Sequence, residues 1–246
     1  MIISGKTDIG QIRQENQDTW RAGRKGNAFA WAAVCDGMGG QRAGRLASTT
    51  AIESIEHDFS QKDFSNNPQD ILYSIIKKSN TAVYQAAYAG GSATFGMGTT
   101  VVAAVLKEKH IFYAHVGDSR IYLFRHQTLV QLTRDHSRVQ EMVEAGEITQ
   151  QQARIHPDRN RITRALGVEA EVQVDVASIP VQIGDEILLC SDGLSNQLSD
   201  EMIVQVLSKY SIYEQPEALI QLANQNGGPD NITAVVMQIT QEDING

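Results

Sequence analysis

Cysteine and long apolar runs are both scarce in this chain. Only two cysteines, Cys35 and Cys190, occur in 246 residues, and no run reaches the roughly 20 apolar residues of a membrane helix. A disulfide framework is thereby excluded, and because both cysteines lie in apolar stretches we expect buried free thiols. The N-terminus lacks the basic region and apolar core of a signal peptide, which predicts a cytoplasmic protein without a membrane partner.

Basic residues are in the minority. The chain has 21 lysines and arginines against 29 acidic residues, a formal net charge of −8. A general nucleic-acid binder needs a basic face, so this balance argues against that class. If several of the acids bind divalent cations, however, the field at that site would be nearly neutral or positive, whatever the total charge.

The size and composition fit one globular domain. A chain of 246 residues can form a single large domain, and 41% hydrophobic with 20% charged residues is an ordinary globular composition. No repeat, low-complexity tract or linker divides the sequence. We therefore expect one domain over residues 1–246, acting as a monomer.

Hydrophobic periodicity predicts the elements of the first half. Residues 2–7 and 29–34 read as strands, and small residues at helical spacing predict a helix over about 42–59. Asn67 followed by Pro68 marks the start of a second helix. Four strands then follow with connections short enough for antiparallel hairpins: Thr99–Leu106, Ile111–Val116, Arg120–Phe124 and Leu129–Leu132.

The second half begins with a polar, Arg-rich segment at about 137–166, which we interpret as an inserted helical flap. Helices are predicted near Ser199 and after Pro216, and strands at Val172–Ala177, Glu186–Cys190 and Thr233–Ile239. Elements in this order favour an α+β fold with two stacked antiparallel sheets and helices outside each.

Aspartates recur where apolar runs meet glycines. Asp36 and Asp192 each follow a strand and precede glycine, Asp118 follows Gly117, and Asp230 precedes the last strand. A single Asp-Gly pair is a common turn signal. Because four such turns would be a weak explanation, we expect the aspartates to converge on one site.

A carboxylate cluster of this kind needs cations. Two like charges at about 4 Å repel by about 4 kcal/mol even at an effective dielectric of 20. Oxygen ligands without paired histidines favour Mg²⁺ or Mn²⁺. Cys35 and Cys190 leave zinc as an alternative, disfavoured because no CxxC or HxxxH spacing accompanies them.

Six motifs follow one another along the chain. They are Arg13-x-x-Asn16-Gln17-Asp18, Val34-x-Asp36-Gly37-Met38-Gly39-Gly40, Met97-Gly98-Thr99-Thr100, His115-Val116-Gly117-Asp118-Ser119-Arg120, Cys190-Ser191-Asp192-Gly193-Leu194 and Gly228-x-Asp230-Asn231-Ile232-Thr233. In this order they resemble the bacterial metal-dependent type 2C (PPM family) serine/threonine protein phosphatases, and the resemblance extends from about Gly5 to Val236.

The resemblance implies a four-layer α-β-β-α sandwich and a centre of two Mg²⁺ or Mn²⁺ ions, with a third-ion position. By this likeness Asp36 bridges both metals and the Gly37 carbonyl binds the second. Asp192 and Asp230 hold the first metal, Asp18 acts through metal-bound water, and Asp118 with Asp192 forms the third-ion position. The ions activate a bridging water for in-line attack on phosphoserine or phosphothreonine without a phosphoenzyme.

Arg13 is the matching phosphate clamp, since its planar fork can donate to two phosphate oxygens. The general acid departs from the family pattern. Met38 and Gln41 stand where family members carry histidine, so we expect a metal-bound water to protonate the leaving group, or a substrate with a good leaving group. His136 reads as a loop or capping histidine.

The flap is expected beside the metals, where it would contact the protein part of the substrate. Its arginines either steer phosphopeptides or cover a helix surface: Arg154, Arg159, Arg161 and Arg164. The predicted partners are phosphorylated proteins, in particular substrates of a serine/threonine kinase. Two other functions remain open: a weakly active phosphoprotein-binding sensor, or a Mg²⁺-dependent nuclease or nucleotide hydrolase, which the missing GxxxxGK[ST] and GxGxxG motifs disfavour.

Overall fold

Two antiparallel sheets form the centre of the computed structural model, which describes residues 1–26, 29–62, 64 and 67–245. The first sheet has the order β1 (Ile2–Asp8), β11 (Ile232–Gln238), β10 (Glu186–Cys190), β7 (Arg120–Arg125) and β8 (Thr128–Gln131). The second has the order β2 (Asp18–Lys25), β3 (Phe29–Met38), β5 (Val101–Lys107), β6 (His110–Val116) and β9 (Asp175–Pro180), with β4 (Gly98–Thr99) paired to the end of β3.

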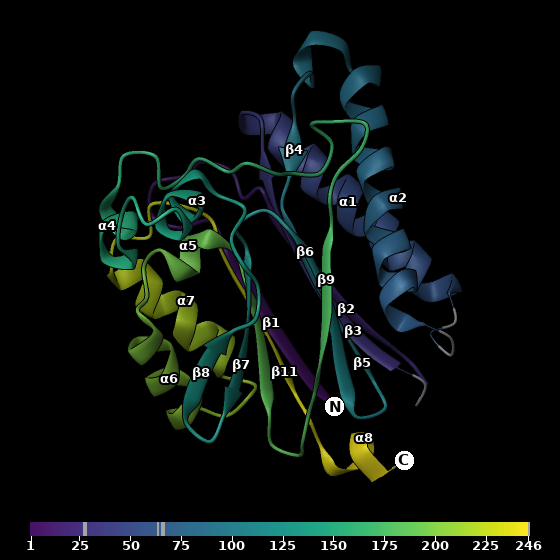
Figure 1. Cartoon of the computed structure of the whole chain (residues 1–246), viewed down its shortest axis with the longest axis vertical. Helices are drawn as coiled ribbons and strands as arrows, with labels where there is room; N and C mark the ends of the chain where they lie inside the picture. Colours follow the sequence, from purple (N-terminus) through teal and green to yellow (C-terminus); the bar gives the residue numbers. More distant parts are fainter. Residues whose placement is uncertain (27–28, 63, 65–66, 246) are drawn as a thin grey trace.

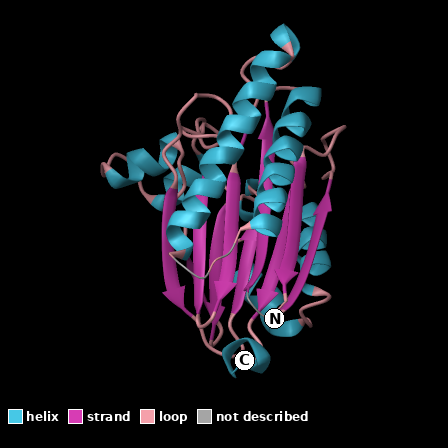
Figure 2. Cartoon of the chain, turned by 90° about the vertical axis from the view of Figure 1, so that its right-hand side faces the viewer, coloured by secondary structure: helices cyan, strands magenta, loops and turns pink. Residues whose placement is uncertain are grey.

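Helices cover the outer face of each sheet (Figure 1). The long helices α1 (Gln41–Gln61) and α2 (Pro68–Ala89) pack on the second sheet, and Figure 2 shows them running along its strands. The first sheet is covered by α5 (Asp192–Ser195), α6 (Asp200–Lys209) and α7 (Gln215–Gln225). The segment after β8 carries the short helices α3 (Arg138–Glu144) and α4 (Gln150–Ile155). The 3₁₀ turn η1 (Gly91–Ala93) follows α2, and the short helix α8 (Gln241–Asn245) follows β11.

Three hydrophobic cores separate these four layers, and β3 shows why. Its residues alternate between the core under α1 and α2, which contains Trp31 and Cys35, and the core between the sheets, which contains Ala32 and Val34. Because both faces of the strand are buried, its sequence is a nearly continuous apolar run. The third core lies between the first sheet and α5–α7. The predicted α-β-β-α sandwich is therefore present.

The helix starts follow the sequence signals. The Asn67 side chain accepts a hydrogen bond from the backbone N–H of Asp70, and Pro68 occupies the first turn of α2. The Ser199 side chain caps α6 in the same way, through the backbone N–H of Met202. These bonds satisfy donors that a helix N-terminus otherwise leaves unpaired.

Four successive strands joined by three hairpins were predicted, and one of these three connections is not a hairpin. Strands β5 and β6 pair, and β7 pairs with β8, but β6 and β7 belong to different sheets. The chain changes sheets over Gly117–Ser119, where Gly117 has a φ of +108°. A short connection serves either path, so its length alone could not distinguish a hairpin from a crossing.

Two further elements differ from the sequence prediction. β2 was missed because Asp18–Lys25 is a polar edge strand that pairs only with β3. The strand predicted at Val172–Ala177 begins at Asp175 instead. Both cysteines are buried free thiols, as expected, and burial raises the pKa of each, which keeps the thiols protonated. Among the described residues, none of the helices has the length and apolar character that a membrane crossing requires.

The core between the sheets generates a stability prediction. Leu189 is fully buried there, so Leu189→Ala should lower the free energy of unfolding by about 2–5 kcal/mol through lost burial and a cavity. Ile155 is 79% exposed, and Ile155→Ala should change it by less than about 0.5 kcal/mol. Denaturant unfolding of both variants measures this, and equal losses would contradict the assigned core.

Candidate metal centre

The pairing of β2 with β3 sets two carboxylates opposite each other. Asp18 at the start of β2 is the cross-strand partner of Asp36 near the end of β3. Side chains at such positions are close neighbours on one face of a sheet. The short connections at this end bring the remaining aspartates to the same place.

Asp18 is buried and only half satisfied. Its Oδ2 accepts hydrogen bonds from the hydroxyls of Ser191 and Thr233, each at 2.7 Å. Its Oδ1 is buried without a hydrogen-bond partner among the described residues. Burial, reinforced by the charges of Asp192 and Asp230, raises the pKa of Asp18 to about 7. An unsatisfied oxygen in a negative environment is suited to a cation or its bound water.

Asp36 is held through its backbone. Its N–H donates to the Thr100 hydroxyl at 3.1 Å, and its carbonyl accepts from the N–H of Thr100 at 2.8 Å. Burial, then the charges of Asp18, Asp192 and Asp118, raises the pKa of the Asp36 carboxyl well above its ordinary value. The site therefore favours a proton or a metal ion on this group.

Asp192 and Asp230 come from the other sheet. Asp192 opens α5 directly after β10, and burial and the charge of Asp230 raise its pKa to about 6, against a hydrogen bond with Asp36 that lowers it. Asp230 stands just before β11. Its neighbour Asn231 donates to the carbonyls of Ile9 and Glu15 at 2.9 and 3.0 Å, which fixes the polar segment after β1 over the site.

Asp118 lies in the crossing between the sheets. Burial, followed by the charges of Asp192 and Asp135, raises its pKa well above the ordinary value, while Arg120 lowers it. The hydroxyls of Thr100 and Ser119 are hydrogen-bonded to each other at 2.7 Å beside it. Because the charge of Asp192 raises the pKa of Asp118, these two carboxyl groups interact electrostatically.

Gly37 requires the absence of a side chain. A Cβ on this residue would lie 2.0 Å from the carbonyl oxygen of Gly44. Only glycine, which has no Cβ, lets the backbone at this position approach α1 so closely. Its N–H donates to the carbonyl of Gln17 at 3.2 Å. This packing holds the backbone of Gly37 at the edge of the site.

These groups surround one pocket of about 560 Å³. Its wall contains four of the five predicted aspartates, together with Arg13, Gly37 and Met38. The fifth aspartate, Asp18, is buried and lines a different pocket with Asn16 and Arg21, and it acts on Asp36 electrostatically. The predicted flap also reaches the pocket, through Asn160 and Ile162. The side chain of Gln41 lies outside the described residues.

Arg13 closes one side of the pocket. Its Nη2 lies 2.8 Å from Oδ2 of Asp230, and its side chain is 52% exposed. The hydrogen bond to Asp230 raises the pKa of the Arg13 guanidinium, helped by the charges of Asp36 and Asp192. Arg13 is thus a permanent cation that faces the carboxylates from solvent.

Several supporting groups were not assigned by sequence reasoning. The hydroxyls of Ser191 and Thr233 hold Asp18, the hydroxyl of Thr100 holds Asp36, and Asn231 anchors the N-terminal segment. Each of the four lies within one of the six motifs, and Ser191 and Asn231 also stand next to an aspartate, which is their sequence signal. His136 lies in the loop before α3, as interpreted, and it is 5% exposed and packs against His115.

Comparison with known proteins fits this geometry. Residues 11–225 match the family model described as protein phosphatase 2C. A serine/threonine phosphatase stp of Listeria welshimeri is 39% identical over 238 residues, which cover 95% of this chain and 94% of that protein.

Solved structures agree with the sequence comparison. The serine/threonine phosphatase PstP/Ppp of Mycobacterium tuberculosis has a TM-score of 0.90 at 35% identity, covering 98% of this chain and 99% of that one. The catalytic domain of PstP in complex with two manganese ions has a TM-score of 0.87 at 34% identity, covering 98% of both.

The chain therefore belongs to the protein phosphatase 2C family. The predicted fold class and enzyme class, a metal-dependent serine/threonine protein phosphatase, are confirmed, as is the dependence on Mg²⁺ or Mn²⁺. The buried carboxylates and the unpaired oxygen of Asp18 fit such ions, since hard divalent cations prefer oxygen ligands.

The raised pKa values generate a prediction for the metal-free protein. Asp18 and Asp192 titrate near 7 and 6 when folded, against an ordinary 3.8, so between these values the folded state binds more protons than the unfolded chain. The stability that their protonated forms provide is complete at low pH and is lost as pH rises through this window. The metal-free melting temperature should fall from about pH 5 to about pH 8.

Calorimetry at both pH values measures this effect, with and without Mn²⁺. Ions compete with protons for the same carboxylates, so Mn²⁺ should raise the melting temperature more at the higher pH. Asp18→Asn should flatten the metal-free dependence, whereas Asp158→Asn, on the exposed flap, should not. A metal-free melting temperature that rises over this range would contradict the assigned electrostatics.

Proposed function

We propose that the pocket removes phosphate from phosphoserine and phosphothreonine side chains of proteins. The observation that carries this proposal is the convergence of four carboxylates and one arginine on a single open pocket. Asp36, Asp192, Asp230 and Asp118 would hold the ions, together with the Gly37 carbonyl, and Asp18 would act through an ion-bound water. When bound, two such ions supply an activated water and neutralise the charge of the phosphate.

The carboxylates contribute charge that the ions neutralise. Without cations, their mutual repulsion and burial favour protonation, which the raised pKa values of Asp36 and Asp118 express. Asp36 is central because its pKa responds to Asp18, Asp118, Asp192 and Asp230 together. A carboxylate that interacts with all the others would be well suited to hold more than one ion.

Arg13 would bind the phosphate. Its guanidinium is exposed, lies at the pocket wall and donates through Nη2 to Asp230. When Asp230 turns its charge toward an ion, the guanidinium is free to donate to two phosphate oxygens. This arrangement places a fixed cation where charge increases as the phosphate is attacked.

None of the described residues that line the pocket is a histidine that could protonate the leaving oxygen. Met38 lines the pocket where a histidine acid would stand, and His136 does not line it. We therefore retain the prediction that water supplies this proton, or that the substrate has a good leaving group.

The flap would select the substrate. We propose a single domain over residues 1–246 with the flap at about 137–166 as its insertion. Asn160 and Ile162 line the pocket, while Arg159 and Arg161 are exposed close by in the chain. Arg164 pairs with Asp175 at 3.0 Å, so of the two roles left open for the flap arginines this contact supports a structural one over the steering of phosphopeptides. The proposed substrates are proteins phosphorylated by a serine/threonine kinase. The enzyme would act on them as a monomer in the cytoplasm.

A phosphoprotein-binding sensor without turnover is the second candidate. The complete carboxylate set argues against it, because binding a phosphate alone does not require four acids around the same pocket. Release of phosphate from phosphoserine and phosphothreonine peptides with Mn²⁺ separates the two. A sensor would bind such peptides without turnover.

Two substitutions test the assigned roles with a phosphothreonine peptide and Mn²⁺. Asp36→Asn should lower kcat by roughly 100-fold or more, because the site loses the charge that joins its ion positions. Arg13→Ala should lower kcat/KM by about 100-fold through loss of phosphate contacts. Arg21→Ala, which removes another half-exposed arginine, is the control and should retain activity. Full activity of either site variant refutes the role of that residue.

The flap prediction separates large from small substrates. Asn160→Ala with Ile162→Ala should lower kcat/KM for phosphopeptides by about tenfold and leave hydrolysis of p-nitrophenyl phosphate nearly unchanged, since only a peptide extends to the flap. Steady-state kinetics on both substrates measures the ratio. Equal losses would show that these side chains support the pocket instead of the substrate.

A further inference from the structure

His136 and Gly117 are joined by two hydrogen bonds. The N–H of His136 donates to the carbonyl of Gly117 at 2.9 Å, and the N–H of Gly117 donates to Nδ1 of His136 at 3.1 Å. Gly117 has a φ of +108°, and a Cβ there would lie 2.6 Å from the Thr100 side chain. The two bonds therefore fix a glycine conformation that immediately precedes Asp118.

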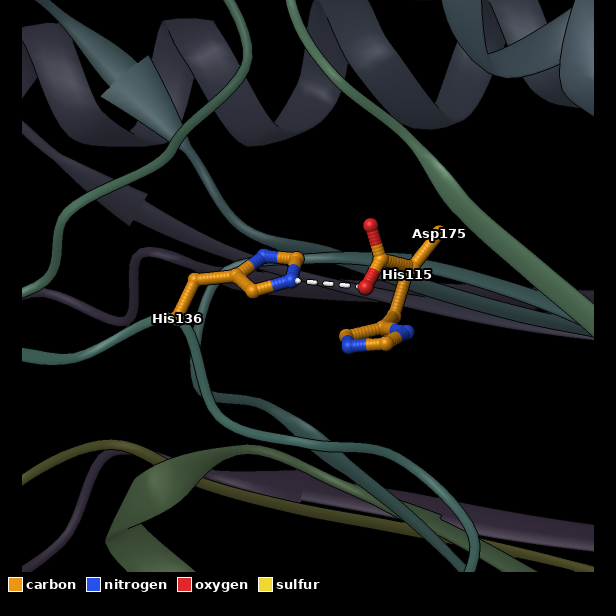
Figure 3. A group of neighbouring side chains, drawn as sticks. All are labelled: His115, His136 and Asp175. Atoms are coloured by element: carbon orange, nitrogen blue, oxygen red, sulfur yellow. Dashed lines mark ion pairs between the residues drawn. The ribbon is translucent and has the colours of Figure 1, made fainter. Parts of the chain in front are cut away.

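These bonds determine the protonation of the imidazole. A neutral ring has one donor nitrogen and one acceptor nitrogen, and the buried N–H of Gly117 needs an acceptor. Nδ1 is therefore unprotonated and Nε2 carries the proton. Nε2 faces Oδ2 of Asp175 at 3.4 Å (Figure 3) and lies 3.2 Å from Nη1 of Arg164, a donor that favours an unprotonated Nε2. Against this donor, Asp175 favours the tautomer that can hold Gly117, as carboxylates do behind other functional histidines.

The surroundings keep this ring neutral. Burial, followed by the positive character of His115 and Arg164, lowers the pKa of His136 to about 4, although Asp175 opposes the shift. The His115 ring stacks on it with centroids 4.6 Å apart. A neutral His136 can accept from Gly117 throughout the physiological range.

The same three side chains also resemble a metal site. His115, His136 and Asp175 offer donor atoms that lie within 4.8 Å of one another. An ion bound by two imidazoles would bring its donors to about 3.3 Å and would need a lone pair on Nε2 of His136. That nitrogen carries the proton, and Arg164 already donates to Asp175 at 3.0 Å. A hydrogen-bonded network describes the cluster better than an ion.

The network also reaches the flap. The N–H of Thr163 donates to the carbonyl of His136 at 2.8 Å, and Arg164 donates to Asp175. One end of the flap is thus tied to both members of the His136–Asp175 pair. On the other side, the pair is tied to the backbone before Asp118.

We propose that the Asp175–His136 pair is a positioning device, which holds Gly117 so that Asp118 points into the pocket and links this carboxylate to the end of the flap. Neither residue is among the described residues that line the pocket. The proposal rests on the proposed function only in taking Asp118 as an ion ligand.

Two readouts test the device. In the metal-free protein, Asp175→Ala should accelerate amide hydrogen exchange of Gly117 by about tenfold, because the wrong tautomer of His136 faces its N–H. In Mn²⁺ titrations followed by electron paramagnetic resonance, the same variant should weaken the lowest-affinity ion by about tenfold. The kcat at saturating Mn²⁺ should recover toward the wild-type value.

A conservative variant provides the rescue. In His136→Asn, the amide oxygen takes the place of Nδ1 and can accept from Gly117 without a partner at Asp175. This variant should keep slow exchange of Gly117 and near wild-type Mn²⁺ affinity. Adding Asp175→Ala to it should then have no further effect on either quantity. Asp185→Ala is the control, since it breaks another aspartate–arginine pair, with Arg125, away from Gly117.

The outcomes are distinct. The proposal is overturned if Asp175→Ala leaves Gly117 exchange unchanged, if Asp185→Ala has the same effects, or if Asp175→Ala acts equally in the His136→Asn background. Loss of Gly117 protection and Mn²⁺ affinity in Asp175→Ala, with both restored when His136→Asn is added, supports it. A wild-type protein that binds no Mn²⁺ would refute the proposed function, while the exchange measurement would still test the device.

Discussion

The repulsion among buried carboxylates is the constraint on which this structure depends. Asp36 has four other aspartates acting on it, and burial adds to their effect, so the pocket is unfavourable for charge unless cations or protons enter. The fold holds the acids together because they lie at strand ends fixed by three apolar cores. The stability that those cores provide offsets the electrostatic cost of the site. The same carboxylates give the site its affinity for cations, which chemistry on phosphate requires.

The architecture joins two kinds of control at this site. The strands and the hydroxyls of Thr100, Ser191 and Thr233 hold the carboxylates rigidly, as ion ligands require. The flap enters from one side and is connected by hydrogen bonds to the segment before Asp118. Under the proposed role of the flap, a bound protein substrate would contact a segment that hydrogen bonds connect to the loop before Asp118.

Much of this could be predicted from the sequence. Strands buried on both faces leave apolar runs, so β3 and β10 were visible, and Asp36, Asp118, Asp192 and Asp230 were marked by their place beside glycines and strand ends. The polar edge strand β2 and the crossing at Gly117 were not, because a polar edge lacks periodicity and a short loop has the same length in either path. The roles of Ser191 and His136 depend on contacts with residues far away in the chain, Asp18 and Gly117 respectively, and no local pattern encodes such contacts.

The most direct measurement is anomalous diffraction from crystals of this protein soaked in Mn²⁺. The account predicts at least two anomalous peaks in the pocket, each within about 2.0–2.3 Å of carboxylate oxygens, with Asp36 shared between them. The same crystals of Asp36→Asn should lose at least one peak. The account would be contradicted if no manganese peak appeared among the carboxylates although the protein still hydrolyses phosphopeptides.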